Sequence, residues 1–405
     1  MLEFEFIKEQ EIPLARIKVI GVGGGGGNTI NSMIDANFHG IEFIVTNTDA
    51  QALALSKAPI KIQLGVKSTK GLGTGANPDL GKRAAEEDLS ALMEHLEDAN
   101  IVFLTGGLGG GTGSGALPVI ARALKEKNIL SIAVVTKPFD FEGKKRAQVA
   151  QEAVQALKKE VDTLLIIPNQ KLLEVVDKHV SMIDAFAMIN SILNQSVKGI
   201  ADIISKPGHI NVDFADVRTI MKDMGLAVMG TGRACGLDRA LQAAQQAIAS
   251  PLLENMSIKG AKGVLLNISG GLNLALYEIG VAASVITEQA DPNANIIVGS
   301  VIDPNLNDEV IVTVIATGFG DQHLENAKEV QLGYKPAVEH GAHIKDQEAY
   351  KQTVQKEEIH EDLHTMRVQE QHVQDLKEDS KEELYSSSTV DLDVPTFMRQ
   401  SEVRE

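Results

Sequence analysis

The chain has 405 residues, enough for two ordinary domains and a tail, since one domain usually takes about 100 to 200 residues. Its formal net charge is −17, which argues against a protein that binds nucleic acid through the phosphate backbone, because that binding depends on Lys and Arg. Aromatic residues make up only 4% and Trp is absent, which favours aliphatic, glycine-punctuated α/β layers over an aromatic-rich β-sandwich. We therefore expect an α/β fold and no nucleic-acid partner.

The single cysteine, Cys235, excludes an intrachain disulfide framework and a metal site built from several cysteines, and it fits a reducing cytoplasm. We interpret it as a small buried hydrophobic residue. The first ten residues lack the basic head and long apolar run of an export signal. The longest uncharged stretch, 99–121, contains seven glycines, so its mean hydropathy is too low for a membrane-spanning helix. We expect a cytoplasmic protein with no direct membrane insertion.

Short β-branched runs alternate with amphipathic helical stretches between residues 16 and 168. This rhythm is typical of βαβ units on a largely parallel sheet. The predicted strands are 17–22, 41–45, 60–64, 101–105, 130–136 and 163–167. We assign residues 1–14 to an N-terminal extension and 15–206 to one nucleotide-binding domain.

Glycine clusters follow the first and fourth of these strands, at 21–28 and 106–115. Each cluster leads into a helical stretch, the second one over 116–125, so main-chain N–H groups at a helix start can bind a phosphate. A third cluster, 71–78, is placed to close over a terminal phosphate. No cluster ends in the Lys-Ser/Thr pair of a Walker A loop, so the phosphates would be held without a phosphate-loop lysine.

A long helix is predicted over 182–205, where apolar residues recur every three or four positions before Pro207 and Gly208 end it. Residues 207–318 then form a second, smaller α/β domain. Its predicted helices are 214–224 and 237–249, and its predicted strands are 263–268, 296–302 and 309–317.

The last 85 residues have a different composition, with 20 acidic and 10 basic side chains and six of the ten histidines. Few of these residues can build a core, so 319–388 is predicted to be a disordered acidic linker. The histidines show no spacing typical of metal ligands. Residues 389–405 bring apolar side chains next to charges, which is the pattern of a short docking peptide.

Several motifs together resemble the tubulin/FtsZ family of GTPases. They are Gly-Gly-Gly-Thr-Gly-Ser-Gly at 109–115, the glycine run at 21–28, and the segments 47–53, 69–78, 135–139, 141–146, 211–217 and 393–399. The resemblance extends from about residue 17 to 318 and includes the terminal peptide. It implies a Rossmann-like GTPase domain, a central helix, and a smaller C-terminal domain that places an acidic loop over the GTP of the next subunit.

The resemblance also implies which residues hold the nucleotide. Those expected at the phosphates are Gly24, Gly25, Gly26, Gly27, Asn28, Gly109, Gly110, Gly111, Thr112 and Gly113, with Thr74, Gly75, Ala76 and Asn77 at the terminal phosphate. Asn47 and Asp49 are expected to bind the nucleotide as well. Glu142 and Arg146 are expected at the sugar and the nearby phosphate, although their spacing alone also fits an i,i+4 ion pair. Phe186 would stack on the guanine and Asn190 would hydrogen-bond it, with Asn28 opposite. Ser191 stands where the family usually has Asp, and a hydroxyl accepts a hydrogen bond from the base less strongly than a carboxylate does.

Asn211, Asp213 and Asp216 are the expected catalytic residues. Read locally, Asp213 is a helix N-cap and Asp216 a favourable first-turn charge. The resemblance implies instead that both carboxylates enter the neighbouring subunit's site and orient the attacking water, with Mg²⁺ and a monovalent cation such as K⁺ at the phosphates. It further implies head-to-tail filaments, a cytokinetic ring at mid-cell, and binding of membrane-tethering and regulatory division proteins by the peptide from Asp391 to Gln400.

Two other functions fit parts of the sequence. A nicotinamide-dependent oxidoreductase would use the pattern Gly21-x-Gly-x-x-Gly26, but it needs an acid at the end of the second strand, where Asp49 is displaced into the loop. A tubulin-like filament without nucleotide turnover would also need the glycine clusters. The two carboxylates Asp213 and Asp216 argue against the second alternative.

Overall fold

The computed structural model describes residues 15–38, 40–173, 180–205, 212–250 and 258–319. These residues all belong to one of the two compact units of the chain, 1–333. The predicted extension 1–14, Asn211, the six tail histidines, the docking peptide and the linker beyond Phe319 lie outside the described residues.

Ten strands form one sheet in the order β3-β2-β1-β4-β5-β6-β7-β10-β8-β9. The first six pair in parallel, as the alternating sequence pattern predicts. The six residues of β1 are all buried, so both faces of this sheet are covered, which is typical of parallel sheets. These strands are β1 (Ile17–Val22), β2 (Ile41–Asn47), β3 (Ile60–Gln63), β4 (Ile101–Gly107), β5 (Leu130–Lys137) and β6 (Thr163–Pro168).

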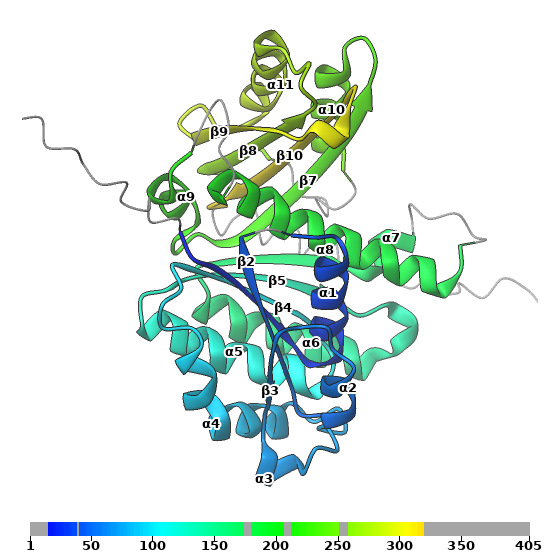
Figure 1. The fold of residues 1–405 in the computed structure, drawn as a ribbon, viewed down its shortest axis with the longest axis vertical. Coiled ribbons are helices and arrows are strands. Elements are labelled where there is room, and N and C mark those ends of the chain that lie inside the picture. The colour runs from blue at the N-terminus through cyan, green and yellow to red at the C-terminus, as the bar shows by residue number, and fades with distance from the viewer. Residues whose placement is uncertain (1–14, 39, 174–179, 206–211, 251–257, 320–405) are drawn as a thin grey trace, which may run out of the picture. The chain divides into compact units, whose positions relative to one another are not determined.

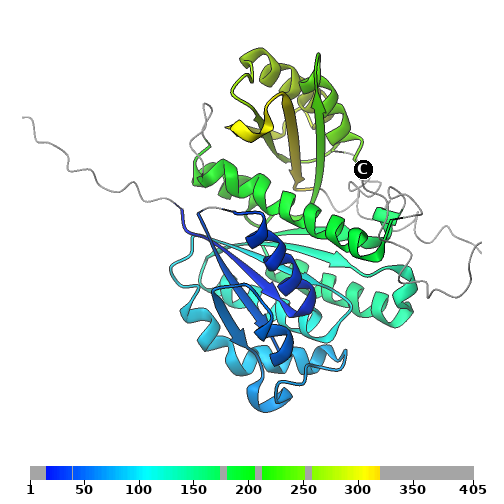
Figure 2. The ribbon, with the colours of Figure 1, turned by 45° about the vertical axis from the view of Figure 1, so that its right-hand side comes forward.

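Helices cover both faces of the parallel half, and Figures 1 and 2 show the helical layers on either side of the strands. Ile17 and Val19 of β1 face a core shared with α1 and α8, whereas Ile20 and Val22 face a core shared with α4, α5 and α6. The helices are α1 (Gly23–Asp35), α2 (Ala50–Ala54), α3 (Val66–Thr69), α4 (Pro78–Glu94), α5 (Gly111–Glu126), α6 (Lys144–Glu160), α7 (Asn169–Leu173) and α8 (Met182–Ser205).

The C-terminal half continues the same sheet with mostly antiparallel pairing. β7 (Gly225–Cys235) pairs in parallel with β6 over three residues, and β10 (Glu309–Thr317) lies antiparallel between β7 and β8 (Gly263–Gly270). β9 (Asn295–Ile302) is parallel to β8. The helices α9 (Phe214–Met221), α10 (Arg239–Ile248) and α11 (Leu276–Gln289) complete this half, and α10 and α11 bury a separate alanine-rich and valine-rich core.

The long helix α8 has the bounds that the sequence predicts. Its buried face touches both halves, because Leu193 and Val197 pack in the core under β5 while Gly199 lies against Thr313 of β10. A Cβ at Gly199 would lie 3.1 Å from Thr313 Cγ2, so this glycine permits a close approach. The helix therefore connects the two halves by packing as well as by chain.

The predicted strands are confirmed to within about two residues at their ends, but β7 and α11 were not predicted. β7 contains Gly230 and Gly232, which look like turn residues in the sequence. In the structure they let α10 pack directly on the strand, because a Cβ at either glycine would collide with the main chain of α10. α11 is rich in β-branched residues, and burial of Ile279, Ala282 and Ile286 on one face stabilises it as a helix.

The interpretation of Cys235 as a buried residue is wrong. Cys235 is the last residue of β7 and is exposed, because burial alternates along the end of this strand and places Arg233 and Cys235 on the solvent side. In the described part of the chain, no helix is both long enough and apolar enough to cross a membrane.

Candidate functional site

Three helices begin next to one another at the carboxyl ends of β1 and β4. α1 begins at Gly23, α5 at Gly111 and α4 at Pro78. The sequence placed the second helix from residue 116, whereas α5 begins five residues earlier, inside the glycine cluster itself. The free N–H groups of three first turns therefore converge at one edge of the sheet, which is an arrangement that binds anions.

The start of α1 packs closely against both β4 and the first turn of α5. A Cβ at Gly26 would lie 2.6 Å from Thr105 O, and one at Gly23 would lie 3.3 Å from both Thr112 Cβ and Gly113 N. Neither position has room for a larger side chain without movement. The glycines thus bring the first turns of α1 and α5 close together. That residues 24–28 and 109–113 hold phosphates stays a prediction.

The start of α4 is held on α5 in the same way. A Cβ at Gly81 would collide with the carbonyl of Gly111, and one at Gly115 would collide with the carbonyl of Pro78. Asn77 caps α4 by accepting from Asp79 N and Leu80 N, at 3.0 and 3.3 Å. Gly81 was missed from the sequence, although a glycine inside a polar helix is a signal of close packing, since it costs about 1 kcal/mol relative to Ala.

The turn over 70–77 contains Gly75 and Ala76, whose φ angles are 57° and 60°. Ala76 is a non-glycine residue in the left-handed region, and such strain is often found where a turn contacts a ligand. Thr74 in this turn is buried beside Thr112 of α5, with 3.4 Å between their Oγ1 atoms. The structure therefore places the residues expected at the terminal phosphate next to those expected at the other phosphates.

Asn47 and Asp49 take local structural roles at the end of β2. Asp49 caps α2 by accepting from Gln51 N at 2.9 Å and Ala52 N at 3.1 Å. Asn47 Oδ1 accepts from Asp49 N at 3.2 Å. These bonds shape the turn that packs against segment 70–77, where Ala50 N donates to Gly71 O.

The residues expected at the base come from α1 and α8. Asn190 Oδ1 accepts a hydrogen bond from Thr29 Oγ1 at 3.3 Å, so Asn190 contacts α1 at the residue that follows the exposed Asn28. Phe186 is 44% exposed and packs edge to face on Phe139, with 5.9 Å between ring centroids. The Phe186 side chain is thus only partly covered, and the remainder is exposed to solvent.

Other polar residues near these helices already have protein partners. Glu142 and Arg146 form an ion pair, and Glu142 Oε1 also accepts from Phe139 N at 2.9 Å. Ser191 Oγ accepts from Gln195 Nε2 at 3.2 Å. Glu142 or Arg146 would contact a sugar either with their ion pair intact or after that pair has broken.

Asp213 and Asp216 lie at the start of α9, where Asp213 is the N-cap and accepts from Asp216 N at 2.8 Å. Both side chains are exposed. Asp213 lines a surface cavity together with Arg16 and Asn100, the residues that precede β1 and β4. The glycine clusters follow the opposite ends of these strands, so the carboxylates and the glycines lie on opposite edges of the sheet.

The charged residues beside Asp213 form a closed network. Lys18 is almost fully buried and donates to Asp98 Oδ1 at 2.6 Å, while Arg16 donates to Asp98 Oδ2 at 2.7 Å. The hydrogen bond from Lys18, with that from Arg16, holds the pKa of Asp98 below its usual value. Asp98 is thus paired, whereas Asp213 and Asp216 present their carboxylates to solvent.

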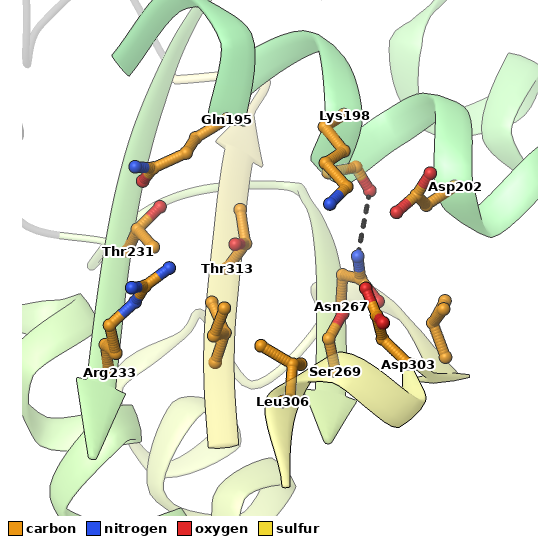
Figure 3. Close-up of a pocket in the computed structure, with 13 residues that line it drawn as sticks. Gln195, Lys198, Asp202, Thr231, Arg233, Asn267, Ser269, Asp303, Leu306 and Thr313 are labelled. Carbon is orange, nitrogen blue, oxygen red and sulfur yellow. Dashed lines mark hydrogen bonds between the residues drawn. The ribbon is translucent and has the colours of Figure 1, made fainter. Parts of the chain in front are cut away.

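A separate cleft lies between α8 and strands β7, β8 and β10 (Figure 3). Asn267 Nδ2 donates to Gly199 O at 3.2 Å across it, and Thr231, Lys198 and Asp303 also line it. Its volume is about 100 Å³, well below the several hundred typical of pockets for larger ligands. None of the residues expected at the nucleotide lines this cleft, and it is too small for a nucleoside triphosphate.

Among the described residues, no group of three or more His, Cys, Asp and Glu is arranged to hold a metal ion. The chemistry of the site nevertheless fits Mg²⁺ carried by a nucleotide, because Mg²⁺ commonly keeps several waters and binds through substrate phosphates rather than an all-protein cage. A bound magnesium ion would then depend on the phosphates for most of its ligands.

Comparison with protein families gives two matches. Residues 16–177 match the GTPase domain of the tubulin/FtsZ family, and residues 225–320 match the C-terminal domain of the FtsZ family. The two matches correspond to the parallel half of the sheet and to its continuation from β7 onward.

Solved structures agree with these matches. A structure described as an empty FtsZ dimer from M. jannaschii is 41% identical, with a TM-score of 0.72 over 76% of this chain and 89% of that chain. A mutant of the M. jannaschii FtsZ is 42% identical, with a TM-score of 0.73 over 76% and 92%. CetZ2 from Haloferax volcanii, described as a protofilament with bound GTPγS, shares the fold at 20% identity, with a TM-score of 0.63 over 78% and 98%.

Proposed function

The chain belongs to the tubulin/FtsZ family of GTPases, and we propose that it binds and hydrolyses GTP at sites formed between successive subunits of a head-to-tail filament. The M. jannaschii relative is described as a dimer, which supports self-association of this chain. Within the filament, one copy supplies the phosphate-binding helix starts and the next supplies the carboxylates.

The placement of Asp213 carries this proposal. The glycine clusters follow β1 and β4, whereas Asp213 lies beside the residues that precede these strands. The six residues of β1 rise about 3.3 Å each, which separates the two edges by about 20 Å. A carboxylate cannot span that distance, and we therefore infer that Asp213 and Asp216 act on the nucleotide of another copy.

The phosphates would be held by main-chain N–H groups of the first turns of α1, α4 and α5, with the glycines Gly24, Gly25, Gly110 and Gly111 allowing close approach. The guanine would lie between Asn28 and Asn190 and stack on Phe186, which is 44% exposed. Asn47, Asp49, Glu142, Arg146 and Ser191 would complete the walls.

The carboxylates of a stacked copy would orient a water in line with the terminal phosphate and accept its proton. The hydrogen bond that Asp216 N donates to Asp213 fixes the start of α9 and so the spacing of the two side chains. Asn211 would lie next to them in the chain. Mg²⁺, and K⁺ where present, would offset charge on the phosphates.

Replacing either carboxylate tests the proposal. Asp213→Ala and Asp216→Ala should each lower steady-state GTP hydrolysis at least about 100-fold under assembling conditions, because water activation is lost. GTP binding to the unassembled chain should stay at the wild-type level. Asp291→Asn, which removes a carboxylate from a loop elsewhere in the C-terminal half, is the matched control. Wild-type turnover in either alanine variant contradicts the proposal.

We further propose that the filaments form the cytokinetic ring at mid-cell in the cytoplasm, and that the peptide from Asp391 to Gln400 recruits membrane-tethering and regulatory division proteins. We also propose that residues 15–206 form the GTP-binding domain, 207–318 the C-terminal domain, 319–388 the linker and 389–405 the docking peptide.

Deleting 390–405 should leave GTP hydrolysis and filament pelleting within about twofold of wild type, because no residue of the nucleotide site is removed. Capture of membrane-tethering partners should be lost, and undiminished capture contradicts the assignment.

The nicotinamide-dependent alternative is disfavoured by Asp49, which caps α2 rather than presenting a free carboxylate to a ribose. A filament without turnover remains a distinct hypothesis. Phosphate release measured above and below the critical concentration separates it from the proposal, since only an assembly-dependent GTPase releases more phosphate per chain as filaments form.

A further inference from the structure

Three threonine hydroxyls form a buried chain behind the starts of α4 and α5. Thr48 Oγ1 lies 2.7 Å from Thr112 Oγ1, and Thr112 Oγ1 lies 3.4 Å from Thr74 Oγ1. Thr48 is fully buried and the other two are more than nine-tenths buried. These residues come from the end of β2, the first turn of α5 and the turn over 70–77, so the chain of hydroxyls joins three separate segments.

The main chain of Thr48 strengthens the same junction. Its carbonyl accepts from Gly73 N at 3.3 Å and from Thr69 Oγ1 at 3.3 Å. Thr48 is thereby held in place by the turn over 70–77 on one side while its hydroxyl contacts α5 on the other. Rotation of the Thr48 side chain is restricted, because a β-branched side chain has few χ1 rotamers.

The number of hydroxyl protons limits how the three threonine hydroxyls can be oriented. Each hydroxyl has one proton to donate and can accept two hydrogen bonds. Two contacts link the three oxygens, so one of the three protons is left for another acceptor. If Thr48 and Thr74 both donate to Thr112, the remaining proton is that of Thr112, the second residue of α5.

An anion at the start of α5 selects that orientation. Thr112 donates to the anion, and the two hydrogen bonds it accepts polarise its hydroxyl and strengthen the one it donates. We propose that Thr48 is a positioning residue that, with Thr74, directs the Thr112 hydroxyl at the terminal phosphate of the nucleotide. This inference rests on the proposed binding of GTP at these helix starts.

The same arrangement couples the terminal phosphate to the turn over 70–77. Thr74 and the anion share one oxygen, so loss of the phosphate frees Thr112 to donate back to Thr48 or Thr74. The hydroxyl chain then reorders without movement of β2. Discrimination between GTP and GDP should therefore depend on Thr48, whose hydroxyl is fully buried and acts through Thr112.

Thr48→Val removes the hydroxyl and keeps the shape of the side chain. Thr46→Val is the matched control, since Thr46 is also fully buried in the same segment and its Oγ1 has no hydrogen-bond partner within the described residues. Thr48→Ser restores the hydroxyl. Affinities for GTP and GDP are measured by displacement of a fluorescent guanine nucleotide below the concentration at which filaments form, and thermal melting without nucleotide checks the fold.

The expected result is that Thr48→Val lowers the ratio of GTP to GDP affinity about fivefold, the loss expected for one hydrogen bond. Thr48→Ser should recover most of the ratio and Thr46→Val should leave it unchanged. An unchanged ratio in Thr48→Val, or an equal loss in Thr46→Val, overturns the role of Thr48. Failure of the wild-type chain to bind either nucleotide overturns the proposed function instead.

Discussion

The parallel half and the C-terminal half of the sheet are each stabilised by a different kind of contact. In the parallel half, the nucleotide edge is built from main chain, with glycines where α1, α4 and α5 meet. In the C-terminal half, the β8–α11 turn is held by a buried side chain: Arg239 donates to both carboxylate oxygens of Glu278, at 2.6 and 2.9 Å, and to Asp308 O at 2.9 Å. Where main chain packs on main chain, an added side-chain atom must move a helix. The Arg239–Glu278 contact can instead be altered without moving the nucleotide edge.

The strongest test of this contrast is Gly81→Ala, where the added Cβ would collide with the Gly111 carbonyl. Relief requires α4 to move away from the start of α5. We expect the free energy of unfolding to fall by about 3 kcal/mol and GTP affinity to fall at least about tenfold. Calorimetry and nucleotide displacement measure the two quantities.

Folding must be separated from binding in that experiment. Circular dichroism at a temperature well below the transition shows whether Gly81→Ala is folded when its affinity is measured. A folded variant with wild-type GTP affinity means that the contact between α4 and α5 does not shape the nucleotide site.

A smaller effect, confined to stability, is expected for Glu278→Gln. The hydrogen bonds from Arg239 hold the pKa of Glu278 below its usual value. Removing the charge should lower the free energy of unfolding by about 2 kcal/mol at neutral pH, as expected for hydrogen bonds to a charged group. GTP affinity of the unassembled chain should not change.

The lowered pKa of Glu278 also predicts how its contribution to stability changes with pH. Because the pKa of Glu278 is lower in the folded chain, its stabilisation is present above the ordinary carboxyl range and is lost as pH falls below about 4. The melting temperatures of the wild type and Glu278→Gln should therefore converge in acid. Glu97→Gln breaks an exposed pair with Lys127 and should cost less than about 0.5 kcal/mol. A constant difference at all pH values contradicts the electrostatic explanation.

The smallest effect concerns a glycine with no packing role. Gly280 lies on the exposed face of α11, and a Cβ there meets nothing within 4 Å. Gly280→Ala should raise the free energy of unfolding by about 1 kcal/mol through helix propensity. Chemical denaturation measures it, and a loss of stability would show that Gly280 has a role beyond its backbone freedom.

Much of the parallel half could be predicted because its strands are short runs of β-branched residues followed by glycine clusters. The central helix was predictable from its regular apolar spacing. The packing roles of Gly230, Gly232 and Gly81 could not be predicted. A glycine needed for close packing looks the same in the sequence as a glycine in a turn until its neighbour in space is known. The hydroxyl of Thr48 was missed for a similar reason, because its partner lies 64 residues away.

Label transfer between copies tests the central claim most directly. Asp216→Ala chains are loaded with γ-labelled GTP, mixed with wild-type chains, and diluted at once with excess unlabelled GTP so that any label that dissociates is not turned over. If a stacked copy supplies the carboxylates, wild-type chains should release labelled phosphate much faster than added Asp216→Ala chains do. Equal release with both additions would contradict a site shared between copies.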